Sequence, residues 1–222
     1  MRAQTLTAFG GSENFKLDEV PDPPRPGDGQ VLIKLAAASV NPVDTKLRAG
    51  GRDIAPEAPT ILGCDGAGTV AAVGPGVSRF RDGDAVFGCM GGVKGHGGTY
   101  ADYILADQRL IAPKPANLDM REAAALPLVT ITAAEALQRS QVAGDSTVLI
   151  RGGTGGVGHI GVQLAKARGA YVVATVSSAE KADLALGLGA DAAPNYREQS
   201  SEDIVEQYTG EAGFDAVFDA TG

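Results

Sequence analysis

Cysteine and histidine are scarce in this 222-residue sequence, which contains two residues of each. The cysteines, Cys64 and Cys89, do not form a C-x-x-C pair. Their number and spacing argue against a disulfide framework and against a structural zinc held by clustered cysteines. Free cysteines of this kind suit a reducing compartment, so we expect a cytoplasmic protein.

Long apolar runs are also missing. No run approaches the roughly 20 residues that a helix needs to cross a bilayer, and the first residues lack the apolar region of a signal peptide. The formal net charge of −8 argues against general binding to nucleic acids or to anionic membranes. The composition, 44% hydrophobic and 21% charged, is that of a globular chain with one large or two small domains.

Two styles of sequence meet near residue 120. Before it, short apolar runs alternate with turn residues, which predicts a compact β-rich domain over residues 1–120. The expected strands of this domain are residues 3–9, 31–40, 68–73, 84–87 and 99–105.

After residue 120 helical and strand patterns alternate, which predicts a parallel sheet with right-handed crossovers over residues 121–222. A capping box of Asp119 and Glu122 opens this part. The expected elements are a helix from 119, a second helix ending near 140, strand 147–151, helix 155–168, strand 171–176, helix 179–187, a short segment near 192–196, helix 201–209 and strand 215–219. A doubly wound dinucleotide domain has about six strands, and about four are counted here, so we expect this domain to be incomplete.

A glycine-rich turn follows a β-branched apolar strand and leads directly into a helical pattern. Gly153, Gly155 and Gly158 stand at G-x-G-x-x-G spacing, with Gly156 and Val157 between them. In dinucleotide-binding folds these glycines permit a tight turn, close approach of the backbone to the pyrophosphate, and close packing of helix on strand. The loop therefore predicts a pyrophosphate site at the helix start; a turn that only packs an α/β unit is the alternative.

The end of the next strand bears on the choice of cofactor. NAD-selective proteins commonly carry Asp or Glu there to bind the adenosine ribose, whereas this chain has Ser177 and Ser178, with Lys181 one helical turn later. Hydroxyl donors and a cation suit a 2′-phosphate, so the sequence favours NADP over NAD. The two serines could also simply cap the following helix.

With these residues in view, the chain resembles the zinc-independent quinone oxidoreductases of the medium-chain dehydrogenase/reductase superfamily. The resemblance covers essentially the whole chain and rests on segments in the expected order: residues 39–48, 62–70, 97–103, 123–127, 131–133 and 195–198. It implies a GroES-like β-rich domain followed by a Rossmann-type doubly wound parallel sheet, with the active site between them. It also implies that Tyr196 lies against the 2′-phosphate side of NADPH.

In that family the chain returns after the Rossmann domain to complete the first domain, and relatives often dimerise through the remaining sheet edge. Neither part is recognised here. We therefore expect a homodimer only for a full-length protein, and aggregation or poor activity for this segment alone.

The resemblance also bears on metal binding. Zinc-dependent relatives place a cysteine or histidine near Asn41, and a His-Glu pair where this chain has Cys64 and Asp65. We therefore expect neither a catalytic nor a structural metal.

Without a metal, the chemistry is expected to come from the cofactor. A hydride from NADPH would reduce a quinone or an α,β-unsaturated carbonyl compound, and the protein would supply donors to the carbonyl oxygen. Asn41, Lys46 and Thr132 are the candidates from the matching segments. Lys46 could equally extend into solvent or pair with Asp44.

Two other functions remain open from the sequence. An enoyl-thioester or enone reductase of the same superfamily would use the same chemistry with another substrate. A non-catalytic NADPH-binding protein, such as a crystallin-type or RNA-binding relative, would need only the cofactor site, and the acidic charge argues mildly against RNA.

Overall fold

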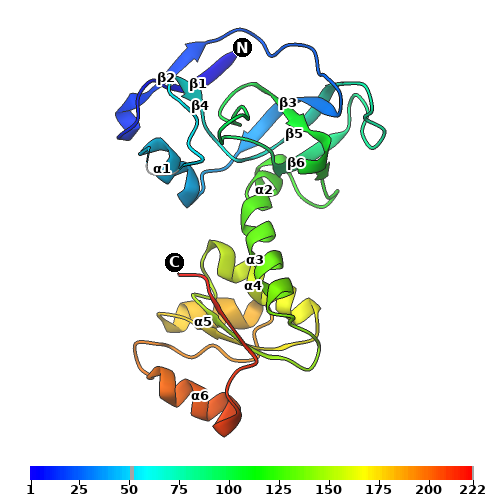
Figure 1. Ribbon diagram of the computed structural model, residues 1–222. Helices are drawn as coiled ribbons and strands as arrows, with labels where there is room; N and C mark the ends of the chain where they lie inside the picture. Colours follow the sequence, from blue (N-terminus) through cyan, green and yellow to red (C-terminus); the bar gives the residue numbers. More distant parts are fainter. Residues whose placement is uncertain (51–52, 222) are drawn as a thin grey trace. The chain divides into compact units, whose positions relative to one another are not determined.

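The computed structural model describes residues 1–50 and 53–221 (Figure 1). The chain forms two compact units, Met1–Leu128 and Val129–Gly222, which run from blue to green and from green to red in Figure 1. The strands of the first unit pair antiparallel, whereas those of the second pair parallel and alternate with helices. This arrangement confirms the predicted fold class.

The first unit contains two antiparallel sheets. A five-stranded sheet has the order β7-β3-β5-β6-β8, and a three-stranded sheet has the order β2-β1-β4. The strands are β1 (Arg2–Leu6), β2 (Phe15–Glu19), β3 (Gln30–Ala38), β4 (Thr60–Ile61), β5 (Asp65–Val73), β6 (Ala85–Cys89), β7 (Tyr103–Asp107) and β8 (Ala112–Pro113). The helical elements are η1 (Ser12–Asn14), α1 (Pro42–Arg48), η2 (Gln108–Leu110) and α2 (Met120–Ala124).

Alternating side chains of the larger sheet form the core of the first unit. Val31 and Ile33 of β3 are fully buried beside Val70, Val86 and Ile104 from neighbouring strands. This two-residue period is the pattern expected for strands with one buried face.

Several predicted strand ends shift in the structure. The strand expected over 99–105 is found at Tyr103–Asp107, because the amides of Thr99 and Tyr100 bind instead the carbonyls of Gly63 and Leu62. The strand expected over 68–73 begins earlier, at Asp65, where it pairs with Cys89 of β6. The other three expected strands differ from β1, β3 and β6 by up to three residues at either end.

Helix α1 was not among the expected elements. Asn41 is its N-cap residue and Pro42 its first residue, and the Asn41 amide N–H donates to Asp44 Oδ2 at 2.7 Å. Asparagine at the N-cap and proline at the first helical position are both strong helix-start signals. The segment therefore carried a local signal for a helix.

The second unit is built on the three-stranded parallel sheet β10-β9-β11. Its buried residues include Val148, Ile150, Val162, Val172 and Ala174, so the sheet packs against α4 through one continuous core. Its elements are α3 (Pro127–Arg139), which begins in the first unit, then β9 (Thr147–Arg151), α4 (Gly156–Ala167), β10 (Tyr171–Thr175), α5 (Ala179–Gly187), α6 (Ser201–Thr209), η3 (Gly210–Ala212) and β11 (Ala216–Asp219).

Sequence periodicity located most of these elements well. The expected bounds of β9, α5 and α6 agree with the structure. Those of β10 and β11 differ by one residue at one end, and those of α4 by one residue at each end. The segment near 192–196 forms isolated parallel bridges, Val173 with Ala192 and Val176 with Asn195, in place of a regular strand.

Helix α2 belongs to the first compact unit. Ala123 and Ala124 are buried against Ala67 of β5. This packing places α2 in the same compact unit as β5, and the compact units divide after Leu128. A domain boundary after residue 120 stays a prediction.

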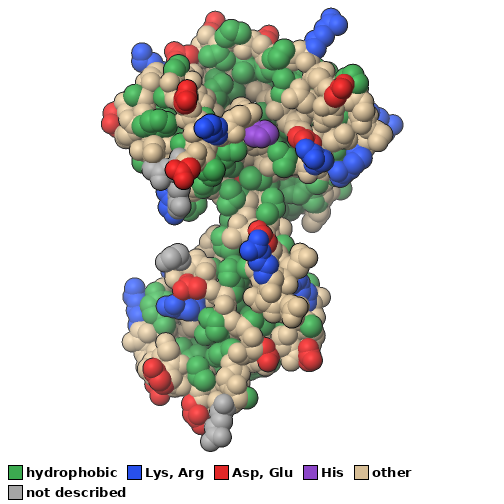
Figure 2. Space-filling view, in the orientation of Figure 1, with side chains coloured by type: hydrophobic (Ala, Val, Ile, Leu, Met, Phe, Trp, Pro, Cys, Tyr) green, Lys and Arg blue, Asp and Glu red, His purple; other side chains and the backbone are tan. Residues whose placement is uncertain are grey.

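Among the described residues, no helix is long and apolar enough to cross a membrane. On the face drawn in Figure 2, acidic and basic side chains occur on both units and are intermixed. That face therefore presents no large field of one sign.

Replacing Asp119 with alanine should lower the free energy of unfolding by about 1 kcal/mol, because an N-cap carboxylate is lost. Asp119 accepts hydrogen bonds from the amides of Arg121 and Glu122, both at 2.8 Å, while the Asp119 amide donates to Glu122. Urea denaturation followed by circular dichroism measures the change. The control is Asp82→Ala, which removes an exposed carboxylate from a turn that caps no helix. An equal loss in both variants would contradict a capping role for Asp119.

Candidate functional site

The glycine loop between β9 and α4 packs tightly against the protein at two positions. A Cβ atom added at Gly158 would lie 2.1 Å from the carbonyl oxygen of Gly152, and one at Gly153 would lie 2.6 Å from the Cβ of Ala174. Both distances are too short for real contacts. These two glycines therefore allow α4 to begin directly above the end of the sheet.

Two further glycines of the loop border open space. Gly155, the N-cap residue of α4, and Gly156, its first residue, are both exposed. A Cβ at Gly155 would approach only Gly152 O, at 3.3 Å, and one at Gly156 only a methyl of Val129, at 3.7 Å. The 12-residue helix leaves its first N–H groups, including that of Val157, without helical partners. These unpaired amides at the positive end of the helix dipole, bordered by open space, can bind a pyrophosphate.

The residues at the end of β10 form one cluster. Lys181 Nζ donates to Ser177 Oγ at 3.1 Å, and Ser178 caps α5 by accepting from the Lys181 amide at 3.3 Å. Tyr196 joins them because its amide donates to Val176 O at 3.1 Å. Its side chain is 53% exposed. Ser178 therefore caps α5, while Ser177 and Lys181 place a hydroxyl and a cation side by side.

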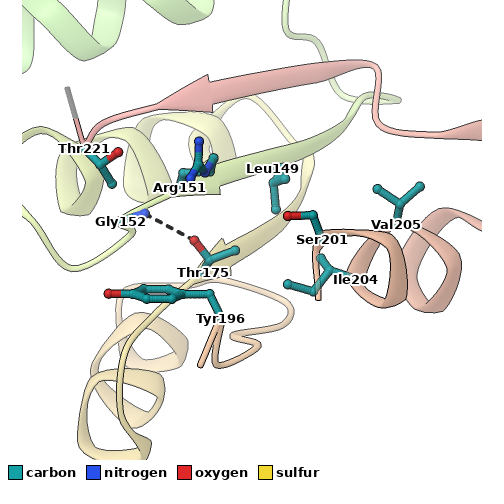
Figure 3. Close-up of a pocket in the computed structure, with 9 residues that line it drawn as sticks. All are labelled: Leu149, Arg151, Gly152, Thr175, Tyr196, Ser201, Ile204, Val205 and Thr221. Atoms are coloured by element: carbon teal, nitrogen blue, oxygen red, sulfur yellow. Dashed lines mark hydrogen bonds between the residues drawn. The ribbon is translucent and has the colours of Figure 1, made fainter. Parts of the chain in front are cut away.

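A pocket of about 440 Å³ adjoins this cluster and the glycine loop (Figure 3). At one end Figure 3 shows Thr175, Tyr196 and Thr221 near Gly152, whose amide donates to Thr175 Oγ1 at 3.3 Å. The remaining lining residues are Leu149, Arg151, Ser201, Ile204 and Val205. Arg151, Thr175 and the α6 side chains were not foreseen from sequence, although Arg151 directly precedes the loop.

In the first unit Asn41 belongs to a buried polar network. Its side-chain Nδ2 donates to Asp65 Oδ2 at 3.0 Å, and the amide of Leu128 donates to the same oxygen at 3.0 Å. Asn41 is 5% exposed and Asp65 is fully buried. The side-chain amide of Asn41 was expected to face a substrate. In the structure its hydrogens instead bind Asp65 and, at 3.4 Å, Ser39 Oγ.

Asp65 is a carboxyl group in an unfavourable setting. Burial raises its pKa above the ordinary value of 3.8, and the hydrogen bonds from Leu128 and Asn41 only partly oppose this shift. Its second oxygen, Oδ1, is buried without a hydrogen-bond partner in the structure described. Burial also raises the pKa of Tyr100, with a further contribution from the negative charge of Asp44.

The two other candidate catalytic residues lie at exposed positions. Lys46 is exposed on α1 of the first unit, and Thr132 is exposed on α3 within the second unit. Asp44, suggested as an ion-pair partner of Lys46, is 3% exposed and binds the backbone of Asn41. Within the first unit the structure therefore joins Asn41 with Asp44 and Asp65.

The positions of the zinc ligands in the resembled family hold poor metal ligands here. Cys64 is 3% exposed among Leu6, Leu47 and Leu62. A hydrogen bond with Cys89, followed by burial, raises the pKa of the Cys64 thiol, opposite to the thiolate that a metal requires. Within residues 1–50 and 53–221, no three His, Cys, Asp or Glu side chains are grouped as a metal site.

Replacing Asp65 with asparagine should raise the free energy of unfolding at pH 7.5, because the amide carbonyl can still accept from Asn41 and Leu128 without a buried charge. The folded state binds the Asp65 proton more tightly than the unfolded chain, so this group's contribution to stability is present below pH 3.8 and is lost as the pH rises. The advantage of the variant should therefore shrink towards pH 4.

Urea midpoints of both proteins at pH 7.5 and near pH 4.5 test this expectation. Asp65→Ala is the matched comparison, because it leaves two buried N–H donors unpaired and should cost about 1–3 kcal/mol for each. If Asp65→Asn is less stable than the unsubstituted protein at pH 7.5, the buried charge of Asp65 is not destabilising and the assignment is wrong.

Comparison with known proteins covers both units. The family described as "Alcohol dehydrogenase GroES-like domain" matches residues 27–116, and that described as "Zinc-binding dehydrogenase" matches residues 156–222. An Arabidopsis thaliana NADPH-dependent alkenal/one oxidoreductase, chloroplastic, is 38% identical over 228 residues, covering 100% of this chain and 58% of that protein. The quinone oxidoreductase of Rattus norvegicus is 39% identical, covering 99% and 66%. The chain thus spans about three fifths of these relatives.

Solved structures agree with this assignment. An alcohol dehydrogenase superfamily protein from Novosphingobium aromaticivorans is 46% identical with a TM-score of 0.92, covering 99% of this chain and 65% of that one. The Escherichia coli quinone oxidoreductase complexed with NADPH is 31% identical with a TM-score of 0.80, covering 95% and 63%. The order of the two units, the glycine loop and these matches all lead to the same assignment. The chain belongs to the medium-chain dehydrogenase/reductase superfamily.

Proposed function

We propose that the protein containing this chain is an NADPH-dependent, zinc-independent oxidoreductase that reduces a quinone or an α,β-unsaturated carbonyl compound. The observation that carries the proposal is the cluster of Ser177, Lys181 and Tyr196 beside the open glycine loop. Related proteins are a quinone oxidoreductase bound to NADPH and an NADPH-dependent alkenal/one oxidoreductase, which supports the same cofactor and acceptor class.

The second unit supplies the cofactor site in this proposal. Amides of Gly156, Val157 and Gly158 would hold the pyrophosphate at the α4 start, beside Gly155, whose own amide donates to Gly152 O at 2.9 Å. Ser177 and Lys181 would bind the 2′-phosphate, for which a charge-assisted hydrogen bond is worth about 1.5–3 kcal/mol. No Asp or Glu occupies the end of β10, where a carboxylate would repel that phosphate.

When bound, NADPH supplies the hydride, and negative charge then develops on the carbonyl oxygen of the acceptor. Asn41, Lys46 and Thr132 remain the residues proposed to act near that oxygen. The side-chain amide of Asn41 donates to Asp65, so we assign Asn41 a role in positioning the nicotinamide and the substrate. Lys46, an exposed cation, is assigned to stabilising the negative charge on the carbonyl oxygen.

The proposal that no zinc takes part rests on the side chains at the positions of the zinc ligands. Asn41 is a weak ligand, and Cys64 is a neutral buried thiol with Asp65 next to it. This set does not match the three ligands and open position of a catalytic zinc.

Replacing Lys181 with alanine should weaken NADPH binding about tenfold or more and leave NADH binding nearly unchanged, because only NADPH presents a phosphate to the lysine. Enhancement of nicotinamide fluorescence measures both affinities, and the chain contains no Trp to interfere. Lys16→Ala, at an exposed position of the first unit, is the matched loss of charge. Equal losses for both cofactors would remove Lys181 from the 2′-phosphate site.

Steady-state oxidation of NADPH tests the reaction itself. Quinones and enones should accelerate oxidation, with enoyl thioesters slower, and Lys46→Ala should lower kcat for the best acceptor by about tenfold. Preference for enoyl thioesters would favour the related reductase activity. Tight NADPH binding without turnover of any acceptor would favour a crystallin-type binding protein.

A further inference from the structure

A second, smaller pocket lies in the first unit, beside helix α1. Its volume is about 210 Å³. A water molecule takes up about 30 Å³ in the liquid, so the pocket has room for a small organic molecule. It lies between one face of α1, the start of β2 and the loop before β7, and the residues that line it are Phe15, Val40, Asp44, Thr45, Arg48 and Tyr100.

This pocket is on the side of α1 that faces away from Lys46, the residue proposed to act on the acceptor. Asp44 and Arg48 stand one turn apart on the helix and therefore share a face. With about 3.6 residues per turn, Lys46 lies about 200° round the helix from Asp44, on the opposite side from the pocket. A ligand bound here would not meet Lys46.

Two residues that line the pocket carry buried polar atoms without a partner. In the part of the chain that the structure describes, neither Asp44 Oδ1 nor Arg48 Nε makes a hydrogen bond. Asp44 is 3% exposed, and its other oxygen accepts from the Asn41 amide at 2.7 Å. The Tyr100 hydroxyl lies close to Asp44 but donates its one hydrogen to Ser39 O at 3.3 Å. One acceptor and one donor thus remain for a ligand to pair with, which is favourable because unpaired buried polar atoms are costly.

The remaining walls are apolar and aromatic. The rings of Phe15 and Tyr100 meet edge to face, with centroids 6.3 Å apart and an interplanar angle of 69°. Val40 is 73% exposed and Thr45 is also exposed, so the pocket opens to solvent beside them. A flat aromatic ring is the group that packs best against such walls.

The charges at the pocket select a neutral polar group. Asp44 would repel a carboxylate or phosphate, and Arg48 would repel an ammonium group. A hydroxyl is neutral and both donates and accepts a hydrogen bond. It can therefore satisfy the carboxylate oxygen and the guanidinium N–H at the same time.

We propose that this pocket is a binding site for a monocyclic phenol. The phenol hydroxyl donates to Asp44 Oδ1 and accepts from Arg48 Nε, and its ring packs against Phe15 and Tyr100. The inference goes beyond the proposed function and does not depend on it, because the site needs neither NADPH nor a reducible acceptor.

Three fluorinated probes, followed by fluorine NMR line broadening on the protein that contains this chain, test the chemistry. The dissociation constant of 4-fluorophenol should be on the order of 1 mM, as expected for so small a ligand. 4-Fluoroanisole, which cannot donate, and fluorobenzene, which has no oxygen, should bind at least about tenfold more weakly, because each leaves Asp44 unpaired. Equal binding of the three probes, or no binding of 4-fluorophenol at about 10 mM, would overturn the proposal.

A matched pair of substitutions on α1 locates the bound probe. Arg48→Met removes the donor and should weaken 4-fluorophenol about tenfold. Lys46→Met removes one positive charge from the same helix, on the side away from the pocket, and should leave binding unchanged. Unchanged binding in Arg48→Met, or the same loss in both variants, would place the probe elsewhere and refute the assignment.

Asp44→Asn tests the direction of the hydrogen bond. The Asn41 amide still needs an acceptor, so the new side chain should turn its oxygen to Asn41 and its NH₂ group to the pocket. The preference for 4-fluorophenol over 4-fluoroanisole should then fall to about threefold or less, because both probes accept from NH₂. A preference that stays tenfold or more would contradict donation to Asp44.

Competition with the cofactor separates this site from the one in the second unit. Saturating NADPH should leave the affinity for 4-fluorophenol unchanged, and displacement by NADPH would overturn the proposal. If NADPH does not bind at all, the proposed function fails, whereas the phenol site is still decided by the probe series and by Arg48→Met. Neither of those measurements requires the Asp44 variant to fold.

Discussion

The close approach of helix α4 to the end of strand β9 is the contact on which the second unit depends. A side chain at Gly158 would stand 2.1 Å from the Gly152 carbonyl, so only glycine lets the helix begin at this depth. That placement directs the first amides of α4 to the carboxyl edge of the sheet. The same edge bears the end of β10, and hence the Ser177–Lys181 cluster and the pocket that contains Tyr196.

A buried carboxylate has a comparable place in the first unit. Asp65 Oδ2 accepts from Asn41, at the start of α1, and from Leu128, at the start of α3. Both donors lie at helix N-termini, where a negative charge is favoured by the exposed amides. Burial makes this charge costly, as the raised pKa of Asp65 indicates. The network therefore orders two helix starts at some expense of stability at neutral pH.

The two units differ in how far apart in the sequence their contacting elements lie. In the second unit β9 and β10 are each followed directly by a helix that packs into the same core, so hydrophobic periodicity along the chain already describes many of the contacts. In the first unit β3 pairs with β5 and β7, which are distant in the sequence. Pairing of that kind decides where strands start and end, and it explains the shifts at Asp65 and Tyr103.

Sequence alone determined the order of the two folds, the glycine loop, the elements β9, α5 and α6, and the grouping of serines and lysine after β10. Each depends on residues within a few turns of one another. Tertiary structure alone decided that Asp65 joins Asn41 to Leu128, 63 residues away from Asp65, and that Arg151 meets Asp219, 68 residues further along the chain. Such pairs depend on sheet register and packing, for which neither residue carries a local signal. Charge and burial at these positions follow from the fold that brings the partners together.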